Sequence, residues 1–572
     1  GAKSVKKSVA VGVLAVGAVV AAAGVFSGRL AADDDHFGHF RFAPDSLVLT
    51  RSVYVGNAAT VTIGEDLPPG CAGGANGSSN VSVPTTTPGV SVSVAVPCGI
   101  ASDNGEFPND QDTHNVWNNG ATDGSFGISS PIFLDNLSED GRLLGMLPIP
   151  SDRIVTSFSS KSELALNRSV DGKSLTFMGY HGGPGCGGNP VSPTAPNLID
   201  VSASNTPGIC DPTNSVISSV ASNPVPTAYY RAVAEVDADG HLSITDGNAY
   251  SGDNGRAAIK GGNDVYYMVG NDNSGNLSKK QLPITPVGIE LINGTGAELL
   301  IPHQPAPLPP NIGMIGRLLF AGDKPGKDTN FRGITISNNT LYISKGSGGN
   351  GINTVYQVGT QGTLPTGSAG DLAKVPITIL PGFPNTAAST NTSFPFGMFF
   401  ANANTLYVCD EGDGAMVAPG PNGNVADAQS LATAGVQKWV LQNGTWTMLY
   451  ALQNGLNIGV PYSVDHYPAS LNPATGGCRN MTGRLNGDGT VTIWAVTSTI
   501  SANGDQGADP NKLVRVTDVV SATTLPTGDG DSDRDDRIGT FKIIRSARAG
   551  EVFRGVALAP KHDDEDDRGG HF

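Results

Sequence analysis

The sequence predicts an all-β protein that folds as a six- or seven-bladed β-propeller. Three observations support this fold class: a two-strand unit recurs along the chain, glycine and proline are frequent, and no long helical pattern occurs beyond residue 30. Each unit reads as a short apolar strand, a polar turn and a second strand. Since one unit cannot bury both of its faces alone, the units must pack on each other. Clear copies of the unit run over 164–177, 256–268, 332–343 and 396–408.

Further hairpins fill the space between these copies. The dipeptides Asp140-Gly141 and Asn443-Gly444 each stand between two apolar stretches, which is the pattern of a tight β-hairpin. A last half-copy over 553–559 carries a first strand with only a charged tail after it. We expect this strand to pair with N-terminal strands, within 46–63 or 131–147, and so to close the ring and remove its exposed sheet edges.

The composition fits many strands joined by turns. The 572 residues include 76 glycines and 39 prolines, and only 15% are charged. One propeller can absorb a chain of this length as a single domain. The formal net charge of −16 argues against nucleic acid as a partner, because phosphate binding requires clustered lysine and arginine. We expect a monomer.

The segment 1–32 is predicted to be a signal peptide. Three lysines precede an apolar run over 9–26 that is rich in alanine and glycine, and small residues follow it. The alternative is an uncleaved membrane anchor, because the run has borderline length for a membrane span. With the signal peptide removed, we expect no transmembrane span and a secreted, periplasmic or cell-surface location.

The remaining chain divides into three parts. We expect an acidic, histidine-containing leader over 33–45, the propeller over 46–560 and an acidic tail over 561–572. Loop-rich insertions interrupt the propeller at 64–128, 181–228 and 502–535.

An even number of cysteines in an exported protein indicates disulfide bonds. Pairing of sequence neighbours is the simplest arrangement, and the last pair would join adjacent blades. Other pairings stay open. The predicted pairs are Cys71–Cys98, Cys186–Cys210 and Cys409–Cys478.

Arginines stand at equivalent positions near the start of several units, namely Arg256, Arg332 and Arg554, whereas Arg168 matches less well. The first strand of each blade lines the central channel of a propeller, so these guanidinium groups would converge there. Together they would bind a carboxylate, phosphate or sulfate. The alternative is that each arginine pairs with an acidic neighbour or a backbone carbonyl and fixes the packing of the blades.

A first candidate calcium site comprises Asp410, Glu411 and Asp413, directly after the strand that ends at Cys409. Carboxylates clustered on a tight loop with glycine suit a hard cation such as Ca²⁺. Glu163, at the start of another unit, would add an oxygen ligand at the channel mouth. The alternative is a solvated acidic turn.

A second candidate calcium site comprises Asp529, Asp531 and Asp533. Their alternation resembles the opening of a calcium-binding loop, but Arg534 occupies the position of the turn glycine. The alternative is a disordered acidic loop.

Several segments resemble a family of exported, mostly bacterial β-propeller proteins that have no assigned activity. The resemblance covers nearly all of 46–560 and implies the fold and export, but no reaction. A looser likeness, based on fold and acidic loops, links the chain to calcium-dependent propeller lactonases and phytases. The segments that carry the family resemblance are 158–167, 171–180, 249–256, 327–333, 345–353 and 550–555.

The expected function is binding or surface interaction, with a small anionic ligand or a surface polymer as the partner and calcium as a candidate structural ion. The alternative is a metal-dependent hydrolase that acts on a lactone or a phosphoester at the channel mouth. In that case the carboxylates at 410–413 would hold the cation and the arginines would steady an anionic substrate. No Gly-x-Ser-x-Gly or His-Glu-x-x-His motif supports another hydrolase.

Overall fold

A computed structural model describes most of the predicted propeller. Most of the leader and of the tail, and the signal peptide, lie outside the described residues, as do large parts of the three insertions. Short strand pieces are also placed between 66 and 130, between 297 and 318, and at 427–428. Apart from single positions, the described ranges are 40–54, 130–181, 231–247, 255–270, 331–346, 352–386, 393–417, 432–469, 472–501, 507–526 and 538–562.

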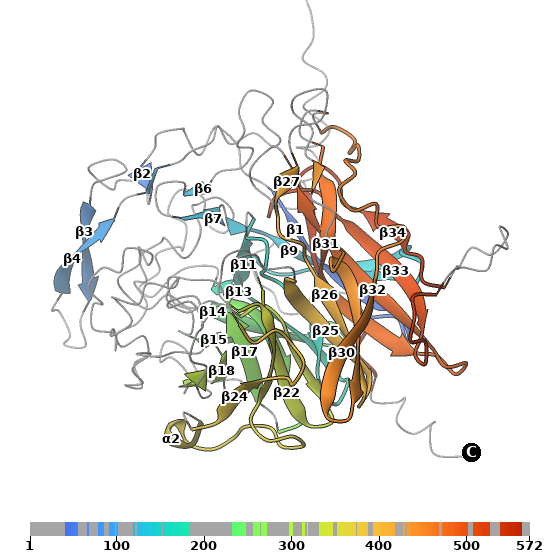
Figure 1. The fold of residues 1–572 in the computed structure, drawn as a ribbon. Helices are drawn as coiled ribbons and strands as arrows, with labels where there is room; N and C mark the ends of the chain where they lie inside the picture. Colours follow the sequence, from blue (N-terminus) through green and yellow to red (C-terminus); the bar gives the residue numbers. More distant parts are fainter. Residues whose placement is uncertain are drawn as a thin grey trace, which may run out of the picture. The chain divides into compact units, whose positions relative to one another are not determined.

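The described residues form an all-β structure, as the sequence predicts. The α-helix placed in this part of the chain, α2 (Ala369–Leu372), has only four residues. No described helix has the length and apolar character needed to cross a membrane. The strands are joined mainly into antiparallel sheets that follow one another along the chain in a propeller-like arrangement (Figure 1).

Five of these sheets contain at least four strands with described side chains. In order of hydrogen bonding, the first is β10 (Leu143–Pro148), β9 (Ile132–Leu137), β1 (Leu47–Val53) and β35 (Glu551–Leu558). The second is β15 (Leu242–Gly247), β14 (Arg231–Asp237), β13 (Ser174–His181), β11 (Ile154–Ser157) and β8 (Ser129–Ser130), with β12 (Asn167–Arg168) also paired to β13. The third is β20 (Arg317–Leu318), β24 (Pro376–Ile379), β23 (Thr354–Val358), β22 (Thr340–Lys345) and β21 (Ile334–Ser337). The fourth is β25 (Pro395–Asn402), β26 (Thr405–Asp410), β29 (Gly435–Gln442) and β30 (Thr445–Leu452). The fifth is β31 (Ala474–Leu485), β32 (Thr490–Ile500), β33 (Lys512–Val519) and β34 (Lys542–Ser546).

Counted in this way, the arrangement has five blades, and this corrects the predicted six or seven. The difference arises in the unit that starts at Arg256. Its sheet has the order β16 (Gly255–Lys260), β17 (Tyr266–Gly270), β18 (Ala297–Leu300) and β19 (Ile312–Met314). Described side chains are confined to β16 and β17, so this sheet is not counted among the five.

The remaining strands form small two-stranded sheets. These pairs are β2 (Asp66–Leu67) with β5 (Gly99–Ile100), β3 (Ser78–Pro84) with β4 (Ser91–Pro97), β6 (Asn118–Asn119) with β7 (Asp123–Gly127), and β27 (Met416–Val417) with β28 (Asp427–Ala428).

The first and the last strand of the propeller segment pair with each other. β1 lies between β9 and β35 and is antiparallel to both, with Leu47 opposite Leu558 and Val53 opposite Glu551 in the β35 ladder. The predicted pairing of the C-terminal half-copy with N-terminal strands is therefore observed. This pairing brings the first and the last strand of the propeller segment into one sheet.

One strand of each large sheet lies against the corresponding strands of its neighbours. β12 contacts β16 and β35, β21 contacts β16 and β25, and β31 contacts β25 and β35. We call β12, β16, β21, β25, β31 and β35 the innermost strands.

Glycines allow the innermost strands to approach each other closely. A Cβ atom on Gly333 would lie 2.0 Å from the carbonyl oxygen of Phe396 in β25. A Cβ atom on Gly397 would lie 2.8 Å from the carbonyl oxygen of Arg479 in β31, and Gly555 in β35 faces the segment before β12 in the same way. Because a methyl group cannot occupy these places without displacing backbone, the spacing of the sheets depends on the glycines.

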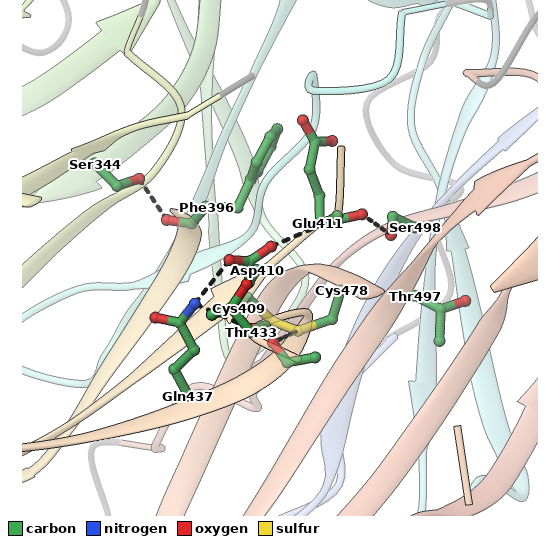
Figure 2. Close-up of a disulfide and its surroundings, with 12 residues drawn as sticks. Ser344, Phe396, Cys409, Asp410, Glu411, Thr433, Gln437, Cys478, Thr497 and Ser498 are labelled. Carbon is green, nitrogen blue, oxygen red and sulfur yellow. Dashed lines mark hydrogen bonds between the residues drawn. A yellow bond between two sulfur atoms is a disulfide. The ribbon is translucent and has the colours of Figure 1, made fainter. Parts of the chain in front are cut away.

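A disulfide joins the fourth and fifth sheets. Cys409 in β26 is bonded to Cys478 in β31, and their Cα atoms are 5.2 Å apart (Figure 2). This confirms the predicted pair and its position between adjacent blades. The other two predicted pairs, Cys71–Cys98 and Cys186–Cys210, lie outside the described residues. A disulfide is compatible with an extracellular location.

Candidate functional site

Arginines occupy corresponding positions on four of the innermost strands. Arg256, Arg332 and Arg554 each stand directly before the residue through which their strand touches its neighbour. Arg479 in β31 occupies the corresponding position, because Gly397 of the neighbouring strand packs closely against its carbonyl oxygen. All four arginines are buried.

Two of these arginines converge on a single hydroxyl group. Arg256 Nε donates to Ser162 Oγ at 2.7 Å, and Arg332 Nη1 donates to the same oxygen at 2.9 Å. Arg256 also donates from Nη1 to the carbonyl oxygen of Phe331. The guanidinium carbon of Arg332 lies 5.5 Å from the ring centre of Phe396, a distance typical of a cation–π contact. The structure therefore brings Arg256 and Arg332 together at one hydrogen-bond acceptor.

Arg554 has a different environment. Its Nη1 and Nη2 groups donate to the carbonyl oxygens of Ser160 and Phe158, and its Nε donates to Ser52 Oγ at 3.2 Å. These bonds tie β35 to the segment before β12, so they agree with the packing alternative for this residue. Arg168 donates to the carbonyl oxygen of Gly172 and closes its own turn.

A buried carboxylate completes the group. Arg479 Nε lies 3.1 Å from Oε2 of Glu411, and Lys161 Nζ lies 3.6 Å from Oε1 of the same carboxylate. The Lys161 side chain is 30% exposed, whereas that of Glu411 is 4% exposed. We call these residues the cationic cluster, which comprises Lys161, Ser162, Arg256, Arg332, Glu411 and Arg479.

The positive charges of the cationic cluster affect the pKa values of Lys161 and Glu411. Burial is the largest influence on Lys161 and lowers its pKa from 10.5 to about 8. The charge of Glu411 opposes this change, and the charges of the three arginines of the cluster add to it. Burial acts to raise the pKa of Glu411, but the neighbouring cations outweigh burial and hold this pKa below its ordinary value.

A pocket adjoins the cationic cluster. It is small, with a cavity volume of about 10 Å³, and Arg332, Phe396 and Arg479 are among its lining residues. Asn167 and Asn480 add polar side chains to the lining. The pocket therefore brings two arginines and two amides from different sheets to one space.

Asp410 is buried within a set of hydrogen-bond donors. Its Oδ2 atom accepts from the backbone N–H of Phe394 at 2.8 Å and from Gln437 Nε2 at 2.7 Å, and its Oδ1 atom accepts from the N–H of Gly412. Burial raises the pKa of Asp410 to about 7, although the backbone bonds and that from Ser393 act in the opposite direction. The carboxylates of Asp410 and Glu411 point apart in Figure 2.

Glu163 lies in a separate environment between β11 and β13. Its carboxylate accepts hydrogen bonds from Thr156 Oγ1 at 2.9 Å, from the backbone N–H of Ser157 and from the Tyr180 hydroxyl. Glu163 follows Ser162 in the chain, and these bonds join strands within one sheet.

Three of the predicted calcium ligands, Asp410, Glu411 and Asp413, are among the described residues. Asp413 accepts a local hydrogen bond from the N–H of Ala415 and is partly exposed. Asp529, Asp531 and Asp533 lie outside the described residues. Within the ranges that the structure describes, no group of three or more histidine, cysteine, aspartate or glutamate side chains is arranged to hold a metal ion.

Sequence reasoning missed Lys161, Ser162 and Arg479. Arg479 follows Cys478 and precedes Asn480, so it lacks the small residue that follows Arg256, Arg332 and Arg554 in the sequence. Lys161 and Ser162 stand before the first strand of their unit and show no motif. Alignment of the unit on the innermost strands would have found Arg479.

Comparisons with known proteins show only distant structural likeness. No protein-family model matches the chain, and no curated protein matches it. The chain is similar to a glucose dehydrogenase, with 10% identity, coverage of 64% of this chain and 89% of that chain, and a TM-score of 0.30. It is also similar to the hemagglutinin-neuraminidase ectodomain of parainfluenza virus 5, with 9% identity, coverage of 87% and 92%, and a TM-score of 0.32. A triple mutant of AofleA from Arthrobotrys oligospora has 9% identity, coverage of 76% and 87%, and a TM-score of 0.29.

TM-scores this low carry no argument about function. The resemblance to exported β-propeller proteins therefore stays a prediction, and the function has to be argued from the site itself.

Proposed function

We propose that this protein is a binding protein that takes a small anionic ligand, or an acidic group of a surface polymer, at the cationic cluster. The observation that carries this proposal is the convergence of Arg256 and Arg332 on Ser162 Oγ, beside the pairing of Arg479 and Lys161 with Glu411. Four cationic side chains thus share this region with the carboxylate of Glu411.

Buried guanidinium groups with a common focus favour a carboxylate, phosphate or sulfate as the ligand. Each can donate two parallel N–H bonds to a pair of oxygens, and low solvent access strengthens the attraction. Ser162 Oγ accepts hydrogen bonds from both arginines, and an oxygen atom of the ligand would accept the same bonds at that position. The low mean charge content of the chain and its net charge of −16 make a local group of cations distinctive.

We infer further that the innermost strands close a ring around this pocket. The contacts of β35 with both β31 and β12, together with its pairing to β1, support that closure. In a closed ring the arginines would face a common axis, which is the arrangement that a central binding site requires.

The contacts of the acidic residues support binding rather than metal-dependent hydrolysis. Asp410 accepts bonds from several protein donors, and Glu411 is engaged by Arg479 and Lys161. Calcium binding and the hydrolase alternative stay predictions from the sequence. Both would require these carboxylates to exchange their present partners for a cation.

Calorimetric titration with sulfate, phosphate and acetate tests the proposal. Arg332→Gln and Arg479→Gln should each weaken binding about tenfold or more, because a charge-assisted hydrogen bond contributes roughly 1.5–3 kcal/mol. Arg484→Gln is the matched control, since Arg484 lies on the same strand as Arg479 but pairs with Glu139 on a partly exposed surface. The control should bind like the original protein.

Equal loss of affinity in the Arg484→Gln control would point to net charge rather than to the site. Absence of any anion binding by the original protein at millimolar concentration would refute the proposed function.

A further inference from the structure

We propose that Lys161 is a nucleophile that forms an imine with a small oxo acid held by the cationic cluster. This proposal rests on the proposed anion binding and adds a covalent step to it. A small oxo acid has a carboxylate directly beside a carbonyl carbon, so arginines that hold the carboxylate would present the carbonyl to a neighbouring amine.

The position of Lys161 suits that chemistry. Its Nζ atom lies 3.6 Å from Glu411 Oε1, and Arg479 holds the other oxygen of the same carboxylate. Lys161 directly precedes Ser162, on which Arg256 and Arg332 converge. The amine of Lys161 is therefore paired with the Glu411 carboxylate, and it lies one residue before the serine that receives two guanidinium groups.

Access and charge also favour Lys161. Its side chain is 30% exposed, whereas that of its partner Glu411 is almost fully buried. A lysine among other cations exists as the neutral amine at lower pH than an ordinary lysine does, and only the neutral amine attacks a carbonyl. The lowering of its pKa to about 8 agrees with this reasoning.

The step balances without any further reagent. Lys161 loses one proton to solvent at pH 8, and its neutral Nζ attacks the carbonyl carbon. A second proton moves from nitrogen to the carbonyl oxygen and gives a carbinolamine. A proton from solvent converts the carbinolamine hydroxyl group to water, which leaves as the C=N bond forms. Of the three protons on the original ammonium group, one has gone to solvent, one leaves in the water and the third stays on the iminium nitrogen.

Reductive trapping provides the test. The full chain is incubated at pH 8 with glyoxylate and cyanoborohydride, which reduces the imine to a stable amine, and modified lysines are located by peptide mass mapping. We expect Lys161 to be modified at least about tenfold faster than Lys512, because orientation by the arginines raises the local concentration of the carbonyl. Lys512 is the internal control, since its pKa is also lowered to about 8 but it lies outside the cluster. Modification spread evenly over Lys161, Lys512 and surface lysines would overturn the proposal.

Two variants and a neutral aldehyde separate this proposal from the proposed function. Lys161→Arg should lose the adduct, whereas Arg332→Gln should lose the preference for Lys161 together with sulfate binding. If sulfate binds and Lys161 still gains no adduct, imine formation is wrong while anion binding stands. If neutral glycolaldehyde labels Lys161 as fast as glyoxylate does and sulfate does not bind, anion binding is wrong and the oxo-acid proposal is wrong with it.

Discussion

Burial lowers the pKa of several lysines among the described residues, including Lys161, Lys438 and Lys512. Lys512 at the start of β33 has its Nζ atom 3.3 Å from the ring centre of Tyr462. Burial lowers the pKa of Lys512 from 10.5 to about 8. The aromatic face compensates part of the lost hydration of the ammonium group, but it supplies no counter-charge. The cost of keeping this group charged should therefore be visible in the pH dependence of stability.

The folded protein should gain stability as the pH rises from about 8 towards 10. Between the folded and unfolded pKa values of Lys512, the unfolded chain binds a proton that the folded chain does not, so one such group adds a slope of at most about 1.4 kcal/mol per pH unit. Urea unfolding at pH 7.5, 8.5 and 9.5 measures the slope. Lys512→Met should reduce it, and an unchanged slope in that variant would contradict the prediction. Measurements stay below pH 10 because Tyr407 and Tyr462 have raised pKa values and act in the opposite direction above it.

The sequence predicts some residues of the cationic cluster and omits others for a physical reason. Arg256 and Arg332 are visible because they head a repeated strand pattern and precede a small residue. Lys161 and Glu411 come from segments outside those strands, and they approach each other only through the packing of different sheets. Such proximity depends on tertiary structure, which spacing along one chain does not encode.

At the scale of strands, tight turns determine which strands form hairpins, and close contacts determine how the innermost strands pack. The predicted hairpins at Asp140-Gly141 and Asn443-Gly444 are observed as β9–β10 and β29–β30. Both residues of the second turn have positive φ, 50° and 77°, which Asn and Gly adopt most readily. These hairpins are predictable because their turns are local, whereas the close contacts between innermost strands are not.

Gly333→Ala should destabilise the protein by roughly 1–3 kcal/mol, as is typical of overpacking. The added methyl group would meet the carbonyl oxygen of Phe396 at 2.0 Å, and a backbone atom cannot turn aside as a flexible side chain does. Gly487→Ala is the matched control, because a Cβ atom there meets nothing within 4 Å. Chemical unfolding of both variants measures the difference, and equal stabilities would show that the innermost strands tolerate a wider spacing.

At the scale of the whole molecule, the pairing of β1 with β35 links the two ends of the propeller segment. Phe553 and Val556 of β35 pack in one apolar cluster with Leu47 and Leu49 of β1, and Trp494 of β32 belongs to the same cluster. β35 thus covers apolar surface on two sheets and satisfies one hydrogen-bonding edge of β1. The number of complete blades was harder to predict than this pairing, because unit spacing in the sequence does not say how many strands each unit contributes.

Deletion of residues 551–572 should cause aggregation or loss of cooperative unfolding. The deletion exposes the edge of β1 and the apolar cluster behind it, and unpaired edges associate with other chains. Deletion of residues 563–572 alone is the control and should leave the unfolding transition unchanged, because it keeps β35 and the bond from His562 to the carbonyl oxygen of Phe42. Size-exclusion chromatography and thermal unfolding compare the two forms. A monomeric, cooperatively unfolding product of the longer deletion would contradict the role given to β35.

The same pairing has a consequence for biosynthesis. A ribosome makes β1 long before β35, so the sheet that holds both cannot be completed until β35 has emerged. Until then one hydrogen-bonding edge of β1 stays unpaired. A chaperone or a translocation channel has that interval in which to act on the chain.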